Sequence, residues 1–195
     1  MAAPAIDADL ARVAERLRQS TVEVRGAGGG VGGGVVWNGD GLIVTNAHVV
    51  REPLRVVAPD RRVLPARLIG WDPERDLAAL TVGAGAGLVA ALKGDPDVLR
   101  PGDLVLAVGH PGGVVGAVTV GVVHAILERG ESPRRRFIQA DLHLAPGNSG
   151  GPLADARGRV VGVNAMIAGG LAVAISTATV AVLLAGLRPR EPSRV

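Results

Sequence analysis

Cysteine and tyrosine are absent from this 195-residue sequence, and aromatic residues make up only 2% of it. Without cysteine the chain has no disulfide framework, no thiol nucleophile and no thiolate metal site. Nucleic-acid-binding surfaces of the RRM and OB type stack bases on aromatic rings, so the scarcity of rings argues against a nucleic-acid partner. The 21 basic residues exceed the 18 acidic ones by three, a net charge of +3 that indicates no particular partner.

The first residues, 1–19, are predicted to form an amphipathic helix. Their apolar positions recur at helical spacing, at Ile6, Leu10, Val13 and Leu17. No basic region precedes an apolar run, which predicts no signal peptide. For the chain as written we expect a cytoplasmic location, and a periplasmic or secreted one if the N-terminus is incomplete.

An uncharged segment near the other end, 160–187, has the length and apolarity of a membrane-spanning helix. A Gly-Gly turn signal interrupts it. We therefore interpret this part of the chain as a strand over 159–165, a strand over 171–175 and a helix over 177–187, and we expect no membrane partner. A protein tethered by 165–187 is the alternative.

Short β-branched runs, separated by Gly, Pro, Asn and Asp, dominate the sequence after the first helix. One set lies within 20–83 and a second within 98–187, with a connection over 84–97 between them and a tail over 188–195. Many short strands with regular turn signals are typical of β-barrels and sandwiches. We predict an all-β fold of two barrels with a seam between them, plus a short helix at each end.

Ser149 lies in the glycine-rich segment APGNSGGP, residues 145–152. Glycines let a backbone turn tightly and point consecutive N–H groups at one spot, where they can stabilise an oxyanion. The alternative is a simple turn in which the serine caps the backbone. The segment also fits the G-x-S-x-G motif of α/β-hydrolases, but those need a histidine after the serine, and all four histidines precede it.

Two other segments offer a base and an acid. His48 follows an apolar stretch in IVTNAHVV, where a neutral imidazole could take the proton of a serine hydroxyl. Asp76 precedes an apolar run, should be partly buried, and needs a partner such as the His48 ring. The plain alternatives are a core histidine and a surface acid paired with Arg75, and Asp72 is the second candidate acid. The order His48, Asp76, Ser149 is the chymotrypsin-type order.

Together these motifs resemble the trypsin-like serine protease domain of the HtrA/Deg family. The matching stretches are GLIVTNAHVV (41–50), WDPERDLAAL (71–80), PGDLVLAVGHPGG (101–113), FIQADLHLAPGNSGGPL (137–153) and GRVVGVNAMI (158–167). The resemblance implies a chymotrypsin-like double β-barrel and a serine endopeptidase with polypeptide substrates, acting on unfolded or exposed segments. It implies His48 as general base, Asp76 as its orienting acid and Ser149 as nucleophile. It also implies an oxyanion hole made by the backbone N–H groups of Gly147 and Ser149.

The same resemblance predicts where substrate binds. Leu171, Ala172 and Val173 resemble the strand whose backbone pairs with an extended peptide. An aliphatic pocket lining without an acid predicts cleavage after Val, Ala, Leu or similar residues. The sequence departs from the family in three ways. For the sequence as written we expect no PDZ module after the domain and no secretory or anchoring N-terminus, and His143 stands near the expected pocket where a small residue is usual. The arginine-rich loop 128–136 lies where a regulatory loop is expected, although we interpret it as a solvated basic turn.

Other functions are weaker interpretations. A catalytically weak peptide-binding protein on the same scaffold is the alternative to an endopeptidase. The G-x-G-x-x-G match within Gly26–Gly34 leads into a strand rather than a helix, so we interpret it as a flexible loop and expect no dinucleotide or other cofactor. His110, His124 and His143 lack zinc-ligand spacing, so we expect no metal. The family is often trimeric, and assembly into a homo-oligomer is left open.

Overall fold

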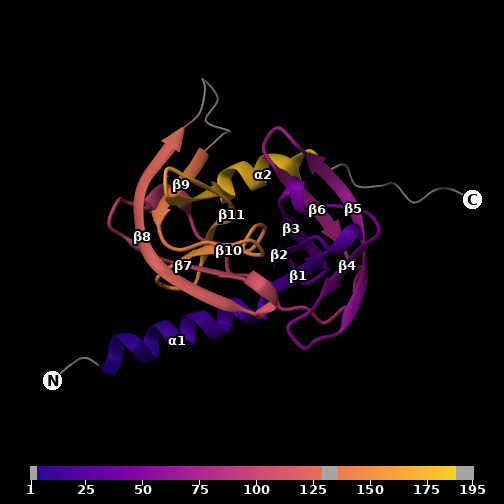
Figure 1. Cartoon of the computed structure of the whole chain (residues 1–195), viewed down its shortest axis with the longest axis horizontal. Helices are drawn as coiled ribbons and strands as arrows, with labels where there is room; N and C mark the ends of the chain where they lie inside the picture. The colour runs from indigo at the N-terminus through magenta and orange to yellow at the C-terminus, as the bar shows by residue number, and fades with distance from the viewer. Residues whose placement is uncertain (1–3, 129–135, 188–195) are drawn as a thin grey trace, which may run out of the picture.

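The β-branched runs fold into strands of two separate barrels in the computed structural model, which describes residues 4–128 and 136–187 (Figure 1). The strands of the first barrel pair in the order β1-β2-β3-β6-β5-β4, and β1 closes the ring by pairing with β4. They are β1 (Thr21–Arg25), β2 (Val31–Val36), β3 (Leu42–Thr45), β4 (Leu54–Val57), β5 (Val63–Asp72) and β6 (Leu77–Thr81).

The second barrel repeats this plan with antiparallel pairs throughout. Its order is β10-β11-β12-β9-β8-β7, and β10 closes the ring against β7. Its strands are β7 (Leu104–Gly109), β8 (Ala117–Glu128), β9 (Arg136–Asp141), β10 (Pro152–Asp155), β11 (Val160–Ala168) and β12 (Leu171–Ser176). The predicted all-β double barrel is therefore confirmed.

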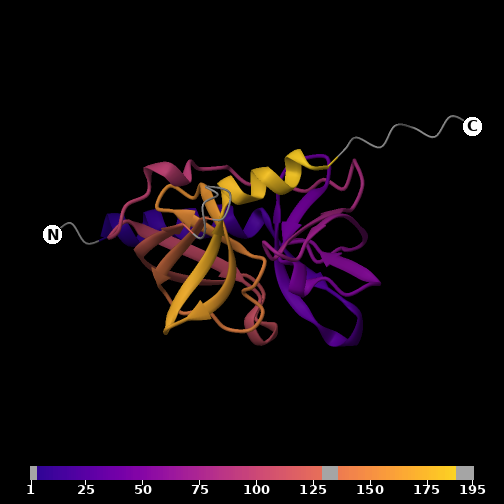
Figure 2. The same cartoon turned by 90° about the horizontal axis from the view of Figure 1, so that it is seen from above.

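Two α-helices flank the barrels. α1 (Pro4–Gln19) contacts β1 and β7 and buries Val13 and Leu17, as its amphipathic pattern predicts. α2 (Thr177–Ala185) contacts strands of both barrels and lies across their junction (Figure 2). Within the described part of the chain, no helix is both long and apolar enough to cross a bilayer. Short 3-10 turns are η1 (Ala27–Gly29), η2 (Ala47–Val49), η3 (Pro96–Val98) and η4 (Pro111–Gly113).

Each barrel has its own apolar core, and a third core joins them. The joining core combines fully buried residues of the first barrel, such as Val44 and Leu77, with Leu106 and Val163 of the second and Val180 of α2. Burying a side chain of this size contributes about 1.5–3 kcal/mol. The seam is therefore a packed interface that holds loops of the two barrels in register.

Gly33 shows why the glycine-rich segment is partly strand rather than the loop expected from sequence. A β-carbon at Gly33 would lie 2.7 Å from the main-chain nitrogen of Gly151 in the second barrel. The Gly33 N–H donates to Ser149 O at 2.6 Å, and its carbonyl accepts from Thr45 Oγ1 at 2.7 Å. Glycine is needed because β2 crosses the serine segment at this distance.

Two sequence-based interpretations lie outside the described residues. The basic turn expected over 128–136 includes residues 129–135, and the tail covers 188–195.

Candidate active site

His48 and Asp76 meet at the edge of the first barrel. His48 lies in η2 directly after β3, and Asp76 lies in the turn between β5 and β6. The His48 ring Nδ1 is 2.9 and 2.8 Å from the two carboxylate oxygens of Asp76, and the His48 main-chain N–H donates to Oδ1 at 3.0 Å. With Nδ1–H held by the carboxylate, Nε2 is left as a proton acceptor.

The backbone of Asp76 is strained and is held from a neighbouring segment. Its φ of +52° lies in the left-handed region that L-residues with side chains rarely adopt. Asn46, which is fully buried, donates from Nδ2 to Asp76 O at 2.9 Å, and Asp76 N donates to Pro73 O at 3.3 Å. Sequence reasoning did not single out Asn46, although a polar residue inside the apolar run before His48 was a usable signal.

The rival acid has a different role in the structure. Asp72 ends β5 and accepts from the main chain of Arg75 at 3.0 Å and from its guanidinium at 2.5 Å. Arg75 therefore neutralises Asp72, and Asp76 is the acid that contacts the imidazole.

The electrostatics of His48 follow from this pairing. The hydrogen bond to Asp76 raises the pKa of His48 above its ordinary value, partial burial opposes this, and the charge of Asp76 adds to the increase. A hydrogen-bonded carboxylate stabilises the imidazolium, which is the form that a general base reaches after taking a proton.

Ser149 lies beside the first barrel although it belongs to the second. A β-carbon built on Gly32 would lie 2.7 Å from the methyl carbons of Val49 and 2.9 Å from Ser149 O. Gly32 therefore lies between Val49, which follows His48 in the chain, and the main chain of Ser149. The Ser149 hydroxyl donates to Ala165 O at 3.2 Å. The structure thus brings the serine segment to the histidine segment, but the hydrogen bond of Oγ runs to Ala165 rather than to His48.

The turn before Ser149 has the geometry of a type II turn. Asn148 N donates to Ala145 O at 3.0 Å, Pro146 occupies the second position, and Gly147 at the third has φ +106°. This conformation sets the direction of the peptide between Pro146 and Gly147. No hydrogen-bond acceptor is found for the N–H groups of Gly147 and Ser149 within residues 4–128 and 136–187.

Gly147 is locked by the second barrel. The His110 main-chain N–H donates to Gly147 O at 3.0 Å, and a β-carbon on Gly147 would lie 2.5 Å from His110 O. A side chain at this position would therefore have to displace either His110 or the turn.

A pocket of about 270 Å³ opens next to Ser149. Apart from Ser149 and Asn148 it is lined by apolar side chains and carries no charged group: Leu144, Ala145, Pro146, Ala165, Met166 and Ile167. His143 is exposed and does not itself line this pocket, although its neighbour Leu144 does, so the expected place of His143 near the pocket stays a prediction.

Of the expected substrate-binding residues Leu171, Ala172 and Val173, the last two are already paired on both sides. Val173 lies opposite Met166 of β11 on one side and Gln139 of β9 on the other, so β12 is paired along both edges. The pairing speaks against the expectation for Ala172 and Val173, because both lie between β11 and β9, and for Leu171 the expectation stays a prediction. The other strand of the hairpin carries the free edge. The pairing of β11 with β10 runs only as far as Val163, whereas the segment from Ala165 to Ile167 lines the pocket.

In the described ranges, no group of three or more His, Asp or Glu side chains could hold a metal ion. The side chains brought together at the seam are those of acid–base and nucleophilic chemistry.

Two closed antiparallel barrels, with a histidine–carboxylate pair and a serine at their seam, define a chymotrypsin-like double barrel. The family model of the trypsin-like peptidase domain matches residues 32–163, and the chain belongs to this family. The resemblance to HtrA/Deg proteases noted in the sequence is confirmed by the similar proteins.

The chain is 40% identical over 161 residues to a protein of Synechocystis sp. named as a putative serine protease, HhoB. The matched region covers 76% of this chain and 38% of that relative. It is 42% identical over 140 residues to a probable periplasmic serine endoprotease, DegP-like, of Ectopseudomonas mendocina, covering 70% of this chain and 29% of the relative. The chain thus spans well under half the length of these curated relatives. The solved structure of the HtrA-type protease AlgW with tripeptide superposes with a TM-score of 0.80 at 32% identity, covering 90% of this chain and 61% of that one.

Proposed function

We propose that this protein is a serine endopeptidase that hydrolyses peptide bonds in unfolded or exposed protein segments. One observation carries the proposal: the Asp76 carboxylate is bonded to both the ring and the main-chain N–H of His48, which leaves Nε2 as a base beside the serine segment. Membership in the trypsin-like peptidase family supports the same reaction.

In the proposed mechanism the Ser149 side chain first rotates about χ1 from one staggered rotamer to another. This rotation breaks the hydrogen bond from its hydroxyl to Ala165 O. His48 Nε2 takes the hydroxyl proton as Oγ attacks the peptide carbonyl, and then gives that proton to the departing amine. Water activated by His48 hydrolyses the acyl-enzyme in the second half-reaction.

The charge that develops on the carbonyl oxygen would be stabilised by the N–H groups of Gly147 and Ser149. Loss of one such donor costs about 3 kcal/mol of transition-state stabilisation. The type II turn held by His110 therefore contributes to the proposed rate alongside the triad.

The substrate would bind as an added strand on the free edge of β11, with its side chain in the pocket beside Ser149. Main-chain hydrogen bonds supply the affinity of such binding, and the pocket supplies the selectivity. The apolar lining supports cleavage after Val, Ala, Leu or residues of similar size.

Casein digestion by wild type and by Ser149→Ala, with product termini read by mass spectrometry, tests reaction and selectivity together. Wild type should release peptides ending in small or medium aliphatic residues, and the variant should release none. Equal digestion by the two proteins would exclude Ser149 as the nucleophile.

A catalytically weak peptide-binding protein is the second candidate, and one observation favours it: the Ser149 hydroxyl donates to Ala165 O. A fluorophosphonate probe separates the two candidates, because it labels a serine only when a base activates it. An adduct at Ser149 supports the endopeptidase. A folded protein without an adduct supports the binding protein.

The cellular location stays a prediction. The DegP-like relative is named as periplasmic, which supports the second of the two locations expected from sequence. Fractionation of cells that express the natural gene would decide between the cytoplasm and an extracytoplasmic compartment.

A further inference from the structure

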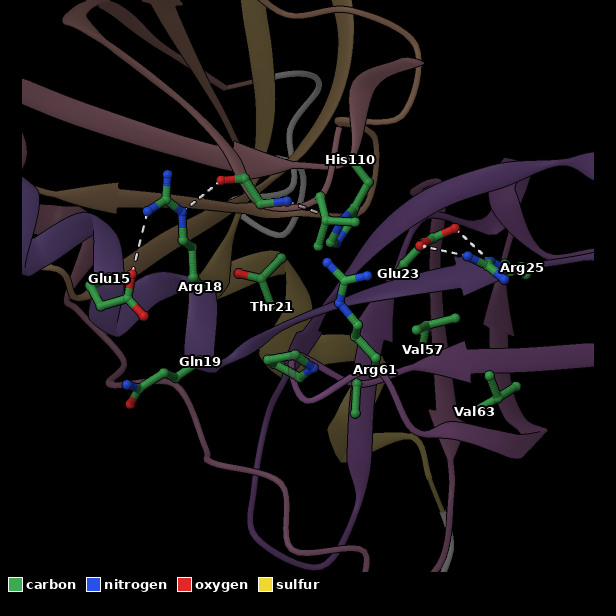
Figure 3. Close-up of a pocket in the computed structure, with 14 residues that line it drawn as sticks. Glu15, Arg18, Gln19, Thr21, Glu23, Arg25, Val57, Arg61, Val63 and His110 are labelled. Atoms are coloured by element: carbon green, nitrogen blue, oxygen red, sulfur yellow. Dashed lines mark hydrogen bonds and ion pairs between the residues drawn. The ribbon is translucent and has the colours of Figure 1, made fainter. Parts of the chain in front are cut away.

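A cavity of about 350 Å³ lies away from the proposed active-site pocket, where the end of α1 meets both barrels (Figure 3). Its walls come from α1, from β1 and the β4–β5 hairpin, and from the segment that follows β7. Apolar side chains, including Val57, Val63 and Val115, form part of the lining. Small-molecule sites have this size and this position between structural units.

The charged groups in the lining do not cancel. Glu15 pairs with Arg18 at 3.4 Å, and Glu23 pairs with Arg25 at 2.6 Å. Within the described residues, the guanidinium of Arg61 has neither a hydrogen bond nor an ion pair. Figure 3 shows it between these two pairs. The cavity therefore carries one uncompensated positive charge.

Arg61 projects toward the cavity from an unusual backbone position. It ends the turn between β4 and β5 with φ +69°, a conformation in which glycine or asparagine is commoner. Its neighbour Asp60 cannot serve as its counter-ion, because Asp60 is already bonded to Arg62 at 2.7 Å. An anion that enters the cavity would be the partner that Arg61 lacks.

His110 forms a polar part of the wall and is 4% exposed. Its Nδ1 accepts from the Gly116 N–H at 3.3 Å, which places the proton of the neutral ring on Nε2. Burial lowers the pKa of His110, partly offset by Glu23 and by the carbonyl of Val22, so the ring is neutral at pH 7. The buried ring therefore adds a neutral surface to the wall, and the charge that a ligand can reach is that of Arg61.

We propose that this cavity is a second ligand site, which binds a small carboxylate with an apolar body. The carboxylate pairs with Arg61, and the apolar body packs on the valines of the two barrels. The site borders the oxyanion turn, because the main chain of the same His110 donates to Gly147 O. Binding at this site does not require the proposed peptidase activity.

Isothermal titration of the full chain with hexanoate tests the proposal, with acetate and hexanamide as probes that lack the apolar body or the charge. We expect saturable hexanoate binding in about the millimolar range, which is usual for a ligand of this size. Acetate and hexanamide should each bind at least about tenfold more weakly. No saturable hexanoate binding, or equal binding of hexanamide, would overturn the proposal.

Arg61→Gln should weaken hexanoate about tenfold and leave hexanamide unchanged, because a charge-assisted pair is lost. Arg67→Gln removes the charge of another exposed arginine, on β5 and outside the cavity, and should change neither affinity. Equal weakening by both variants would show attraction to general positive charge and would reject the site.

NMR shows the position of the ligand through the ring resonances of the four histidines. Variants of the exposed His48, His124 and His143 assign the fourth set of resonances to His110. Hexanoate should shift the His110 resonances with the affinity found by titration, and it should do so in Ser149→Ala as well. A failed peptidase assay would therefore leave this result standing. Shifts at His48 instead of His110 would place the ligand in the active site and contradict the proposal.

Discussion

Asn46 holds the main-chain carbonyl of Asp76, with 2.9 Å between Nδ2 and the oxygen. The two residues are thirty positions apart, and the bond fixes a carboxylate whose own φ is +52°. The acid that orients His48 is therefore itself oriented by a side chain two residues before that histidine. This makes Asn46 a positioning residue for the proposed reaction.

Asn46→Ala should lower kcat on the order of tenfold with little change in KM, because the carboxylate loses its alignment with the ring. Loss of the buried hydrogen bond should also destabilise the fold by about 1–3 kcal/mol. A merely structural role would not move the pH profile, whereas a positioning role should lower the apparent pKa of His48. The control is Val56→Ala in the core of the first barrel, which should cost stability and leave the profile in place.

The pH dependence of activity should report His48. Because the hydrogen bond to Asp76 raises the pKa of His48, activity should rise with pH with a midpoint above 6.5, its ordinary value. Asp76→Asn should move that midpoint down and reduce kcat about 10⁴-fold, the effect of losing the correct tautomer. A profile whose midpoint is the same in both proteins would show that the ring and the carboxylate do not interact in solution.

The same pair has a consequence for stability. The folded-state pKa of His48 lies above the unfolded value, so its contribution is fully present below pH 6.5 and is lost as pH rises through the raised pKa. Urea unfolding from pH 5 to pH 9 should therefore show a decline in this window that is absent in His48→Ala. An identical dependence in both proteins would assign the decline to other groups.

Gly147→Ala should reduce kcat by about 10²–10³-fold, because a β-carbon forces the turn away from His110 and removes one oxyanion donor. Gly102→Ala is the matched control. Gly102 also has a positive φ, +93°, but no atom lies within 4 Å of its added β-carbon. Both variants should lose some stability, and only Gly147→Ala should lose turnover. Full turnover in folded Gly147→Ala would contradict the assignment of the oxyanion hole.

Ile167→Asp should change selectivity. Ile167 lines the pocket beside Ser149 and is 55% exposed, so the protein should tolerate the change while the pocket gains a negative charge. Cleavage after Lys or Arg should increase relative to cleavage after Val or Leu, as read from the termini of casein peptides. Val89→Asp adds the same charge at a similarly exposed residue outside the pocket and should leave the cleavage pattern unchanged.

Much of the architecture could be predicted from local sequence. The two strand sets, the amphipathic α1 and the strand–turn–strand–helix reading of the apolar C-terminal segment rest on patterns within a few residues. The glycine-rich segment was harder, because glycine is a poor strand former. Residues 31–36 form β2, and Gly33 is required there by its approach to Gly151 across the seam.

The two edges of the β11–β12 hairpin show what local sequence could not distinguish. β11 and β12 are both short apolar strands of one hairpin, and nothing local distinguishes them. Only their long-range partners do: β9 covers the second edge of β12, while the pairing of β10 with β11 stops at Val163. The edge next to Ser149 is thus a product of topology.

The sequence by itself determined which reactive groups are present and their order along the chain: an imidazole, a carboxylate and a glycine-flanked hydroxyl. It also determined the two sets of strands that form the barrels. These depend on residue type and on neighbours along the chain. The tertiary structure alone decided that Asn46 holds the Asp76 carbonyl, that His110 holds Gly147, and which strand edge stays open. Those features arise from contacts between segments far apart in the chain, which no local pattern specifies.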